Sequence, residues 1–124
     1  MNAGFRWYIA DAMTPAHSTA PETSHESLCL LNDSRADASV VLTAFFEHAE
    51  PETSAKFIVP AKRSVHLRLD DPARIGGLRI PVGVPYGLVV DADARLALQY
   101  SRLDTAQSAY ALMSVVPPAE SRNV

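Results

Sequence analysis

One stretch of the sequence alternates apolar and polar side chains more regularly than any other. Between Lys62 and Leu69, three branched apolar residues stand at every second position from Val65 onward, and the residues between them are polar or basic. An extended strand places alternate side chains on opposite faces, whereas a helix would scatter them. The apolar side chains are Val65, Leu67 and Leu69, and the polar ones are Lys62, Ser64, His66 and Arg68. We therefore expect a β-strand with one buried face, which other strands must cover.

Further short β-prone segments recur along the chain, separated by residues that favour turns. The expected strands cover residues 5–10, 26–32, 40–47, 56–59, 86–91 and 95–102. The last two are separated by three residues, which favours a hairpin. Residues 14–25 are rich in Pro, Ser and Thr, and residues 70–83 hold two Pro and three Gly, so both are expected to be loops. This spacing predicts an all-β fold, an antiparallel β-sandwich.

The C-terminal part of the chain permits two interpretations. Asp104 followed by Gln107 resembles a helix N-cap with its partner, and the Ala-rich run after it could continue as a helix. The alternation of Tyr110, Leu112 and Ser114 with smaller residues instead favours a strand. We expect a tight bend or single helical turn at 104–107 and then a strand, with residues 117–124 forming a frayed terminus.

Length and charge narrow the class of protein. The 124 residues, 48% of them hydrophobic, suffice for one domain spanning 1–124. The net charge of −3 gives no general attraction to nucleic acid or to an anionic membrane. Cys29 is the single cysteine and cannot form an internal disulfide, so we expect a cytoplasmic protein. Because Cys29 lies within an apolar strand segment, we expect it to be a core residue. No apolar run is long enough to span a membrane.

The segment VVLTAFFE, residues 40–47, is apolar on both of its faces. Val40, Leu42 and Phe46 would lie on one side, and Val41 and Phe45 on the other. Nineteen alanines leave few bulky side chains to fill the core of a single subunit. We therefore expect one face of this strand to be covered by another subunit.

Residues that could carry chemistry are scattered. The four His residues do not have the spacing of metal ligands, so we expect no metal. The sequence also has no serine nucleophile elbow and no Gly-rich phosphate-binding loop, so we expect no cofactor and no enzymatic activity. His25 and Glu26 are adjacent, so a strand would point them to opposite faces. The basic stripe from Lys62 to Arg68 is either a solvated face or a ligand-binding face. Arg102 and Asp104 share a face and would lock a corner or form a polar pocket.

Several short motifs, in their order and spacing, make the chain resemble the cyanobacterial sensory rhodopsin transducer family. They cover nearly the whole chain. The motifs are Trp7, Ile9 and Ala10 near the start; Ser24-His25-Glu26; Pro60-Ala61-Lys62-Arg63 continuing to His66-Leu67-Arg68; and Gln99 with Ser101-Arg102-Leu103-Asp104 and Gln107. The chain departs from the family pattern at Tyr100, where the family has His, and at Ala106, where it has a second Arg.

The resemblance implies a cytoplasmic, jelly-roll-like β-sandwich that assembles as a homotetramer. The founding relative couples to a membrane photoreceptor, other relatives occur apart from any rhodopsin, and the sandwich is similar to carbohydrate-binding modules. The family has no agreed catalytic residues. The residues that fall on its motifs are proposed to bind a ligand or partner: Trp7, His25, Glu26, Arg63, His66, Arg68, Arg102, Asp104 and Gln107.

Three functions remain open at this point. The first is a non-enzymatic signalling or ligand-sensing module that binds a small polar ligand or a partner protein, such as a membrane photoreceptor. The second is a carbohydrate-binding protein of sugar metabolism, in which Trp7 or Tyr86 stacks on a sugar. The third, which the negative charge disfavours, is a regulator that binds DNA through the basic stripe.

Overall fold

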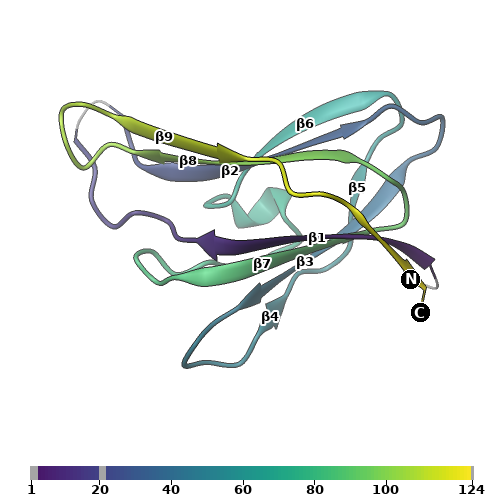
Figure 1. Ribbon diagram of the computed structural model, residues 1–124, viewed down its shortest axis with the longest axis horizontal. Helices are drawn as coiled ribbons and strands as arrows, with labels where there is room; N and C mark the ends of the chain where they lie inside the picture. The colour runs from purple at the N-terminus through teal and green to yellow at the C-terminus, as the bar shows by residue number, and fades with distance from the viewer. Residues whose placement is uncertain (1–2, 20–21, 124) are drawn as a thin grey trace.

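Two antiparallel β-sheets face each other in the computed structural model, which describes residues 3–19 and 22–123 (Figure 1). The strands are β1 (Ala3–Ala12), β2 (His25–Asn32), β3 (Ala38–Phe45), β4 (Glu52–Thr53), β5 (Phe57–Val59), β6 (Arg63–Arg68), β7 (Tyr86–Ala92), β8 (Ala97–Asp104), β9 (Ala111–Val115) and β10 (Glu120–Asn123), with one short 3₁₀ helix, η1 (Pro72–Arg74). The predicted all-β sandwich is confirmed.

The chain crosses repeatedly between the two sheets. Sheet A has the strand order β10-β1-β7-β3-β4, and β5 also pairs with β3; sheet B has the order β6-β2-β8-β9. The first three strands already alternate A, B, A. Consecutive strands therefore pack face to face more often than they pair edge to edge, which gives the sandwich a single shared interior.

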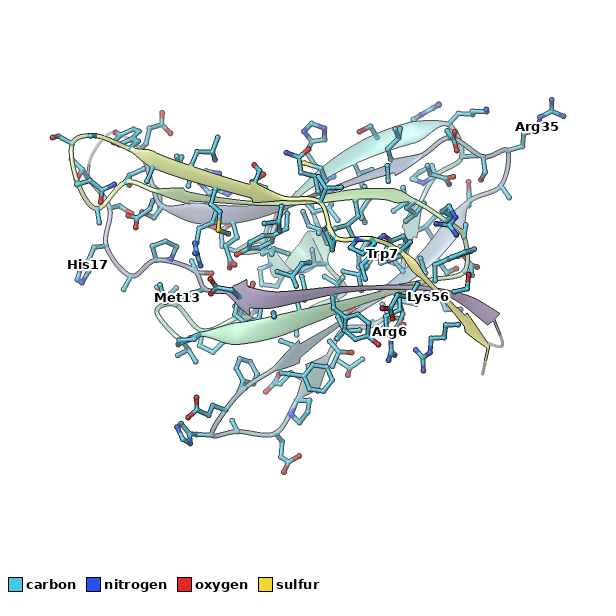
Figure 2. The ribbon with its side chains drawn as sticks, in the orientation of Figure 1. Arg6, Trp7, Met13, His17, Arg35 and Lys56 are labelled. Carbon is cyan, nitrogen blue, oxygen red and sulfur yellow. The ribbon has the colours of Figure 1, made fainter. Side chains whose placement is uncertain are left out.

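The core lies between the inner faces of the two sheets. Sheet A contributes Trp7 and Leu42, which are 1% and 0% exposed, and sheet B contributes Leu28, Leu30 and Tyr100, which are all 0% exposed. Burial of each such side chain stabilises the fold by roughly 1.5–3 kcal/mol. Figure 2 shows Trp7 in the space between the sheets. Trp7, one of the predicted binding residues, therefore lies in the core.

The two strongest strand patterns are confirmed. In β6, Leu67 is buried while His66 and Arg68 are exposed, as the alternation predicts. In β3, Val40 and Leu42 face the core, and Phe45 on the opposite face is 46% exposed. The strand thus has two apolar faces, of which only one is covered within this chain.

The hairpin expected between residues 86–91 and 95–102 is wrong, because β7 belongs to sheet A and β8 to sheet B. Asp93 holds the end of β7 on sheet A, since its carboxylate and its backbone N–H both bond to the backbone of Ser39 in β3. Leu96, only 4% exposed, then enters the core. The three residues 92–94 could have formed a hairpin turn. The chain instead crosses to the other sheet, where the side chain of Leu96 is buried in the core.

The C-terminal segment divides between the two earlier interpretations. The bend followed by a strand is confirmed, because residues 106–109 bend and β9 spans Ala111–Val115. The frayed terminus is contradicted: Glu120–Asn123 forms β10, paired with β1 from Arg6↔Glu120 to Ala3↔Asn123. Backbone pairing to a long edge strand outweighs the weak strand propensity of this tail. Its last residue, Val124, lies outside the described residues.

Two long loops connect strands of different sheets. Residues 14–19 and 22–24 of the loop predicted at 14–25 lie outside strands and helices, His25 already begins β2, and residues 20–21 lie outside the described part of the chain. The second loop, residues 69–85, contains η1 and buries Ile75 and Leu78 in the core. Gly76, at φ +65°, approaches Ala55 so closely that an added Cβ would lie 2.1 Å from the Ala55 carbonyl oxygen.

Cys29 is not a core residue. On β2 the buried side chains alternate as Glu26, Leu28 and Leu30, so Cys29 faces outward and is half-buried. Its cross-strand neighbours are His66 on β6 and Gln99 on β8. The apolar composition of the segment concealed the phase of the strand, which is set by the burial of the charged Glu26 rather than of the thiol.

Candidate functional site

Glu26 is the centre of a buried polar cluster between the two sheets. Its carboxylate is 0% exposed. Thr14 Oγ1 donates a hydrogen bond of 2.6 Å to it, and the backbone N–H of Met13 one of 3.1 Å. The Tyr86 hydroxyl lies 2.8 and 3.0 Å from the two carboxylate oxygens, and the Tyr100 hydroxyl donates to the second oxygen. We call this set of residues the Glu26 cluster.

The donors of the Glu26 cluster are held in their protonated form. Burial raises the pKa of Tyr86 and of Tyr100 above the usual value for tyrosine, and the carboxylate of Glu26 raises both further. Arg102 acts in the opposite direction on both hydroxyls, which places its positive charge close to the cluster. A buried carboxylate with several donors is satisfied without an ion pair. The cluster therefore fixes the loop residues Met13 and Thr14 against the core.

Arg102 is the charged residue at the mouth of this region. It pairs with Glu26 across β8 and β2, so its side chain points inward, and that side chain is 19% exposed. Its Nη2 lies 3.7 Å from Met113 Sδ and 3.9 Å from Asp11 Oδ2. Both contacts are long, and Asp11 is 84% exposed. The guanidinium keeps donors available to a carboxylate, a phosphate or a sugar hydroxyl.

The corner that follows β8 fastens the loop at 13–24. The hydroxyl of Ser24 donates to the His17 carbonyl at 2.7 Å and lies 3.1 Å from the hydroxyl of Thr105. The backbone N–H of Thr105 donates to Ser24, and Thr19 N–H donates to the Thr105 carbonyl at 2.6 Å. Ser24 and Thr105 are both buried. The corner therefore has a structural role, in which Ser24 of the Ser24-His25-Glu26 motif is joined to Thr105, a residue that no motif included.

Asp104 and Gln107 shape the bend instead of a pocket. The Asp104 carboxylate accepts from the N–H of Ala106 at 2.9 Å, and Gln107 Nε2 donates to the carbonyls of Asp104 and Ala109. Arg102 points toward Asp11, not toward Asp104. The sequence hypothesis of an Arg102–Asp104 pair does not match this geometry, because the chain bends immediately after Asp104.

The remaining predicted residues lie apart from the Glu26 cluster. His25 is half-exposed on the opposite face from Glu26, with Nδ1 2.8 Å from the Thr23 carbonyl oxygen. Arg63, His66 and Arg68 are exposed on β6, and Arg68 forms two hydrogen bonds with Asp70, at 2.9 and 2.8 Å. That pairing lowers the pKa of Asp70. Of the nine predicted residues, the structure brings together Glu26 and Arg102.

Three residues of the Glu26 cluster were missed as site residues: Thr14, Tyr86 and Tyr100. Tyr86 was considered as a platform for sugar stacking, but it is 4% exposed and its ring is tilted against Phe46, with the ring centroids 6.3 Å apart. A signal was present at Tyr100, which departs from the family pattern beside Arg102. A buried strand position that holds a hydroxyl needs a partner, and the carboxylate of Glu26 supplies it.

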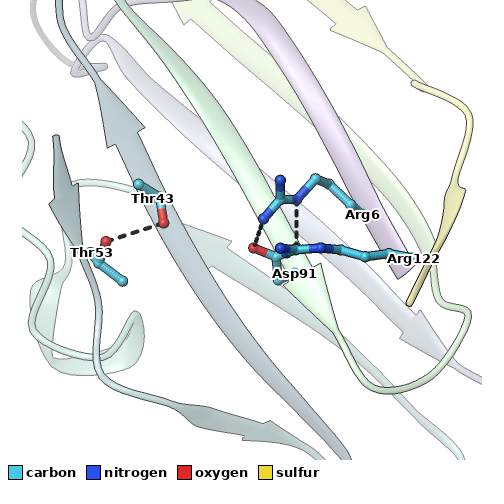
Figure 3. A network of polar contacts seen from close by, with 5 residues as sticks. All are labelled: Arg6, Thr43, Thr53, Asp91 and Arg122. Atoms are coloured by element: carbon cyan, nitrogen blue, oxygen red, sulfur yellow. Dashed lines mark hydrogen bonds and ion pairs between the residues drawn. The ribbon is translucent and has the colours of Figure 1, made fainter. Parts of the chain in front are cut away.

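A second polar cluster lies on the outer face of sheet A. Asp91 on β7 accepts from Arg6 on β1 at 2.7 and 2.9 Å and from Arg122 on β10 at 2.8 Å (Figure 3). Burial opposes the ionised form of Asp91, but the two guanidinium groups outweigh it and lower the pKa of Asp91. This ion pair network joins three neighbouring strands and anchors the C-terminal one.

The described residues hold neither a metal-ligand cluster nor a membrane-spanning helix. Residues 3–19 and 22–123 contain no group of three His, Cys, Asp or Glu side chains placed to hold a metal ion. Within the same residues, none of the helices has the length and apolar character required to cross a membrane.

The comparisons with known proteins agree with this fold. The model of the Anabaena sensory rhodopsin transducer family matches residues 3–117. The crystal structure of Thermotoga maritima 1070 is 30% identical, covers 95% of this chain and 96% of its own, and has a TM-score of 0.81. The structure of the Anabaena sensory rhodopsin transducer is 28% identical, covers 78% of this chain and 95% of its own, and has a TM-score of 0.64. No curated protein sequence matches. The chain belongs to the Anabaena sensory rhodopsin transducer family.

Proposed function

We propose that this chain is a non-enzymatic, ligand-sensing signalling module that works in the cytoplasm as a homotetramer and passes its signal to a partner protein. The observation that carries the proposal is the position of Arg102, a guanidinium with only long contacts at the mouth of the Glu26 cluster. Family membership supports a transducer-like role.

The ligand fits the chemistry of the mouth. A small polar molecule with a carboxylate, a phosphate or vicinal hydroxyls would accept hydrogen bonds from Arg102. Asp11, its present neighbour, precedes Met13 and Thr14, which donate to Glu26. Drawing Arg102 away from Asp11 would therefore act at the residue where β1 leads into the loop at 13–19. That loop would be the element that reports ligand binding to the partner.

The exposed apolar face of sheet A supports the homotetramer. Tyr8 on β1, Phe45 on β3 and Ile58 on β5 are 49%, 46% and 50% exposed on strands of one sheet. Exposed large apolar side chains on the outer face of one sheet favour an interface between subunits. Light scattering should give the mass of a tetramer, and Phe45→Glu should reduce it. A monomer for the unsubstituted chain would contradict this part of the proposal.

Thermal unfolding in a library of sugars, carboxylates, phosphates and nucleotides tests the ligand. A ligand at a hundred times its Kd stabilises the folded state by about 2.7 kcal/mol, which raises the Tm by several degrees. We expect Arg102→Gln to abolish the shift and Arg35→Gln, a matched change at an exposed residue outside the predicted binding set, to leave it intact. If no compound shifts the Tm, or if the two variants respond alike, the proposed site is wrong.

The two alternatives receive less support. Sugar stacking on Trp7 or Tyr86 would require an exposed ring, and these rings are 1% and 4% exposed. DNA binding would rely on the exposed basic residues of β6, and the ion pair of Arg68 with Asp70 reduces their positive charge. Retardation of duplex DNA that weakens steeply with salt would revive the DNA-binding alternative.

A further inference from the structure

The loop that joins β3 to β4 and the segment that leads into β7 enclose a cleft of about 550 Å³. Figure 1 shows the β3–β4 hairpin projecting from the sandwich, so that its inner side faces the rest of the molecule. We propose that this cleft, formed by residues 46–52 and 79–85, binds a small organic cation with an apolar body, such as an aryl-alkyl ammonium ion. The proposal concerns residues other than Arg102 and goes beyond the function proposed above.

The floor of the cleft is apolar and firmly supported. Phe46 is half-buried, and its ring packs on Tyr86, which belongs to the Glu26 cluster. Pro81, Val84 and Pro85 face it from the other wall, and Val84 is 39% exposed. A volume of this size is within the range of small-molecule sites, which are mainly lined by apolar side chains with a few polar groups.

The charge of the rim selects the sign of the ligand. Glu47, Glu50 and Glu52 are exposed along the hairpin side, while Arg79 is the cationic residue of the lining. His48 lies 3.2 Å from Glu47, and both side chains are more than four-fifths exposed. With His48 neutral, three carboxylates against one guanidinium give the cleft a local charge of −2. An ammonium or guanidinium group on an apolar stem therefore complements both the rim and the floor.

Both walls of the cleft connect to the Glu26 cluster. Val84 belongs to one wall, and the N–H of the preceding Gly83 donates to the Thr14 carbonyl at 2.7 Å. The side chain of Thr14 in turn donates to Glu26. Phe46, on the other wall, packs on Tyr86, which also donates to Glu26. A ligand in the cleft would thus contact two segments that both connect to Glu26, one through Thr14 and the other through Tyr86.

A titration of the full chain with 2-phenylethylammonium, followed by amide NMR spectra, tests the site. We expect chemical-shift changes concentrated in residues 46–52 and 79–85. The neutral isostere 2-phenylethanol should bind about tenfold more weakly, because it keeps the apolar body and loses the attraction of the carboxylates. The anion 3-phenylpropionate should leave these residues unchanged.

A charge-neutral variant separates the rim from the floor. The triple change Glu47→Gln, Glu50→Gln and Glu52→Gln keeps the shape of the cleft, and we expect it to weaken the ammonium ion about tenfold and the alcohol very little. Glu120→Gln, an exposed change on β10, is the matched control and should have no effect. The proposal is overturned if the cleft residues do not respond, if the alcohol binds as tightly as the cation, or if the triple variant retains full affinity. Arg102→Gln should leave binding of the ammonium ion in the cleft unchanged. A failure of the cleft proposal can therefore be distinguished from a failure of the proposed function.

Discussion

Replacing Glu26 with glutamine tests whether the charge of the buried carboxylate stabilises the folded state. Glutamine has nearly the same shape, so the substitution removes the charge without opening a cavity. Glu26 accepts from the N–H of Met13 and from the hydroxyls of Thr14, Tyr86 and Tyr100. The amide keeps one oxygen for these donors, and its NH₂ group faces the others.

The magnitude follows from the number of hydrogen bonds that change. A hydrogen bond to a charged group contributes about 1.5–3 kcal/mol, against about 0.5–1.5 kcal/mol for a neutral one, so each of four bonds loses about 1 kcal/mol. The tyrosine and threonine hydroxyls can turn to accept from the new NH₂ group, and the cost of burying a charge disappears; both effects offset part of the loss. We expect Glu26→Gln to lower the free energy of unfolding by about 2–3 kcal/mol, a fall in Tm of roughly 6–12 °C.

Chemical and thermal unfolding at one fixed protein concentration measures this difference, because oligomerisation makes stability depend on concentration. Glu120→Gln, which changes the same charge at an exposed position, should stay within about 0.5 kcal/mol of the original chain. A double-mutant cycle with Tyr86→Phe should show that the two losses are not additive. If Glu26→Gln is as stable as the control or more stable than the original chain, the charge of the carboxylate does not stabilise the fold and the reasoning fails.

Two further changes test other features of the fold. Asp91→Asn should lower stability by about 1 kcal/mol at neutral pH, because it removes the negative charge that Arg6 and Arg122 contact and leaves a single acceptor oxygen. The pKa of Asp91 is lowered in the folded state, so this contribution is present above the ordinary carboxyl pKa of about 3.9 and is lost as pH falls through the lower folded value. Denaturation curves of the two proteins should therefore converge in strong acid, and a difference that grows on acidification would contradict the prediction. Gly76→Ala should cost roughly 3 kcal/mol and Gly77→Ala roughly 1 kcal/mol, because both have positive φ but only at Gly76 would the new Cβ meet a backbone oxygen; equal unfolding midpoints for the two variants would refute the contact.

The sequence predicts the strands of this fold well where the pattern of apolar and polar side chains is a local signal. The alternation at β6 and the two-faced apolar pattern at β3 are local signals, and both are seen in the structure. The sequence failed where a distant partner decides. The pairing of residues 120–123 with β1 depends on an edge strand more than a hundred residues away, and the crossing after β7 depends on the place of Leu96 in the core.

The candidate site was predictable only in part, for a similar reason. Glu26 and Arg102 were identified by their motifs, and the strand register places them side by side. Thr14, Tyr86 and Tyr100 could not be assigned to Glu26, because the donors come from a loop and from two different sheets. Strand periodicity states which face a side chain occupies, but not which hydroxyl from the opposite sheet meets it.

The pairing of the last strand with the first has a practical consequence for engineering. Ala3 and Asn123 are register partners, and Figure 1 shows β1 and β10 side by side where β1 begins, at the end of the sandwich opposite the loop at 13–24. A linker of a few residues could join the ends and convert β10 and β1 into a hairpin. New termini could then be opened in the exposed segment 47–51. Such a circular permutant would carry a fused fluorescent reporter beside the cleft, where the original termini could not place it.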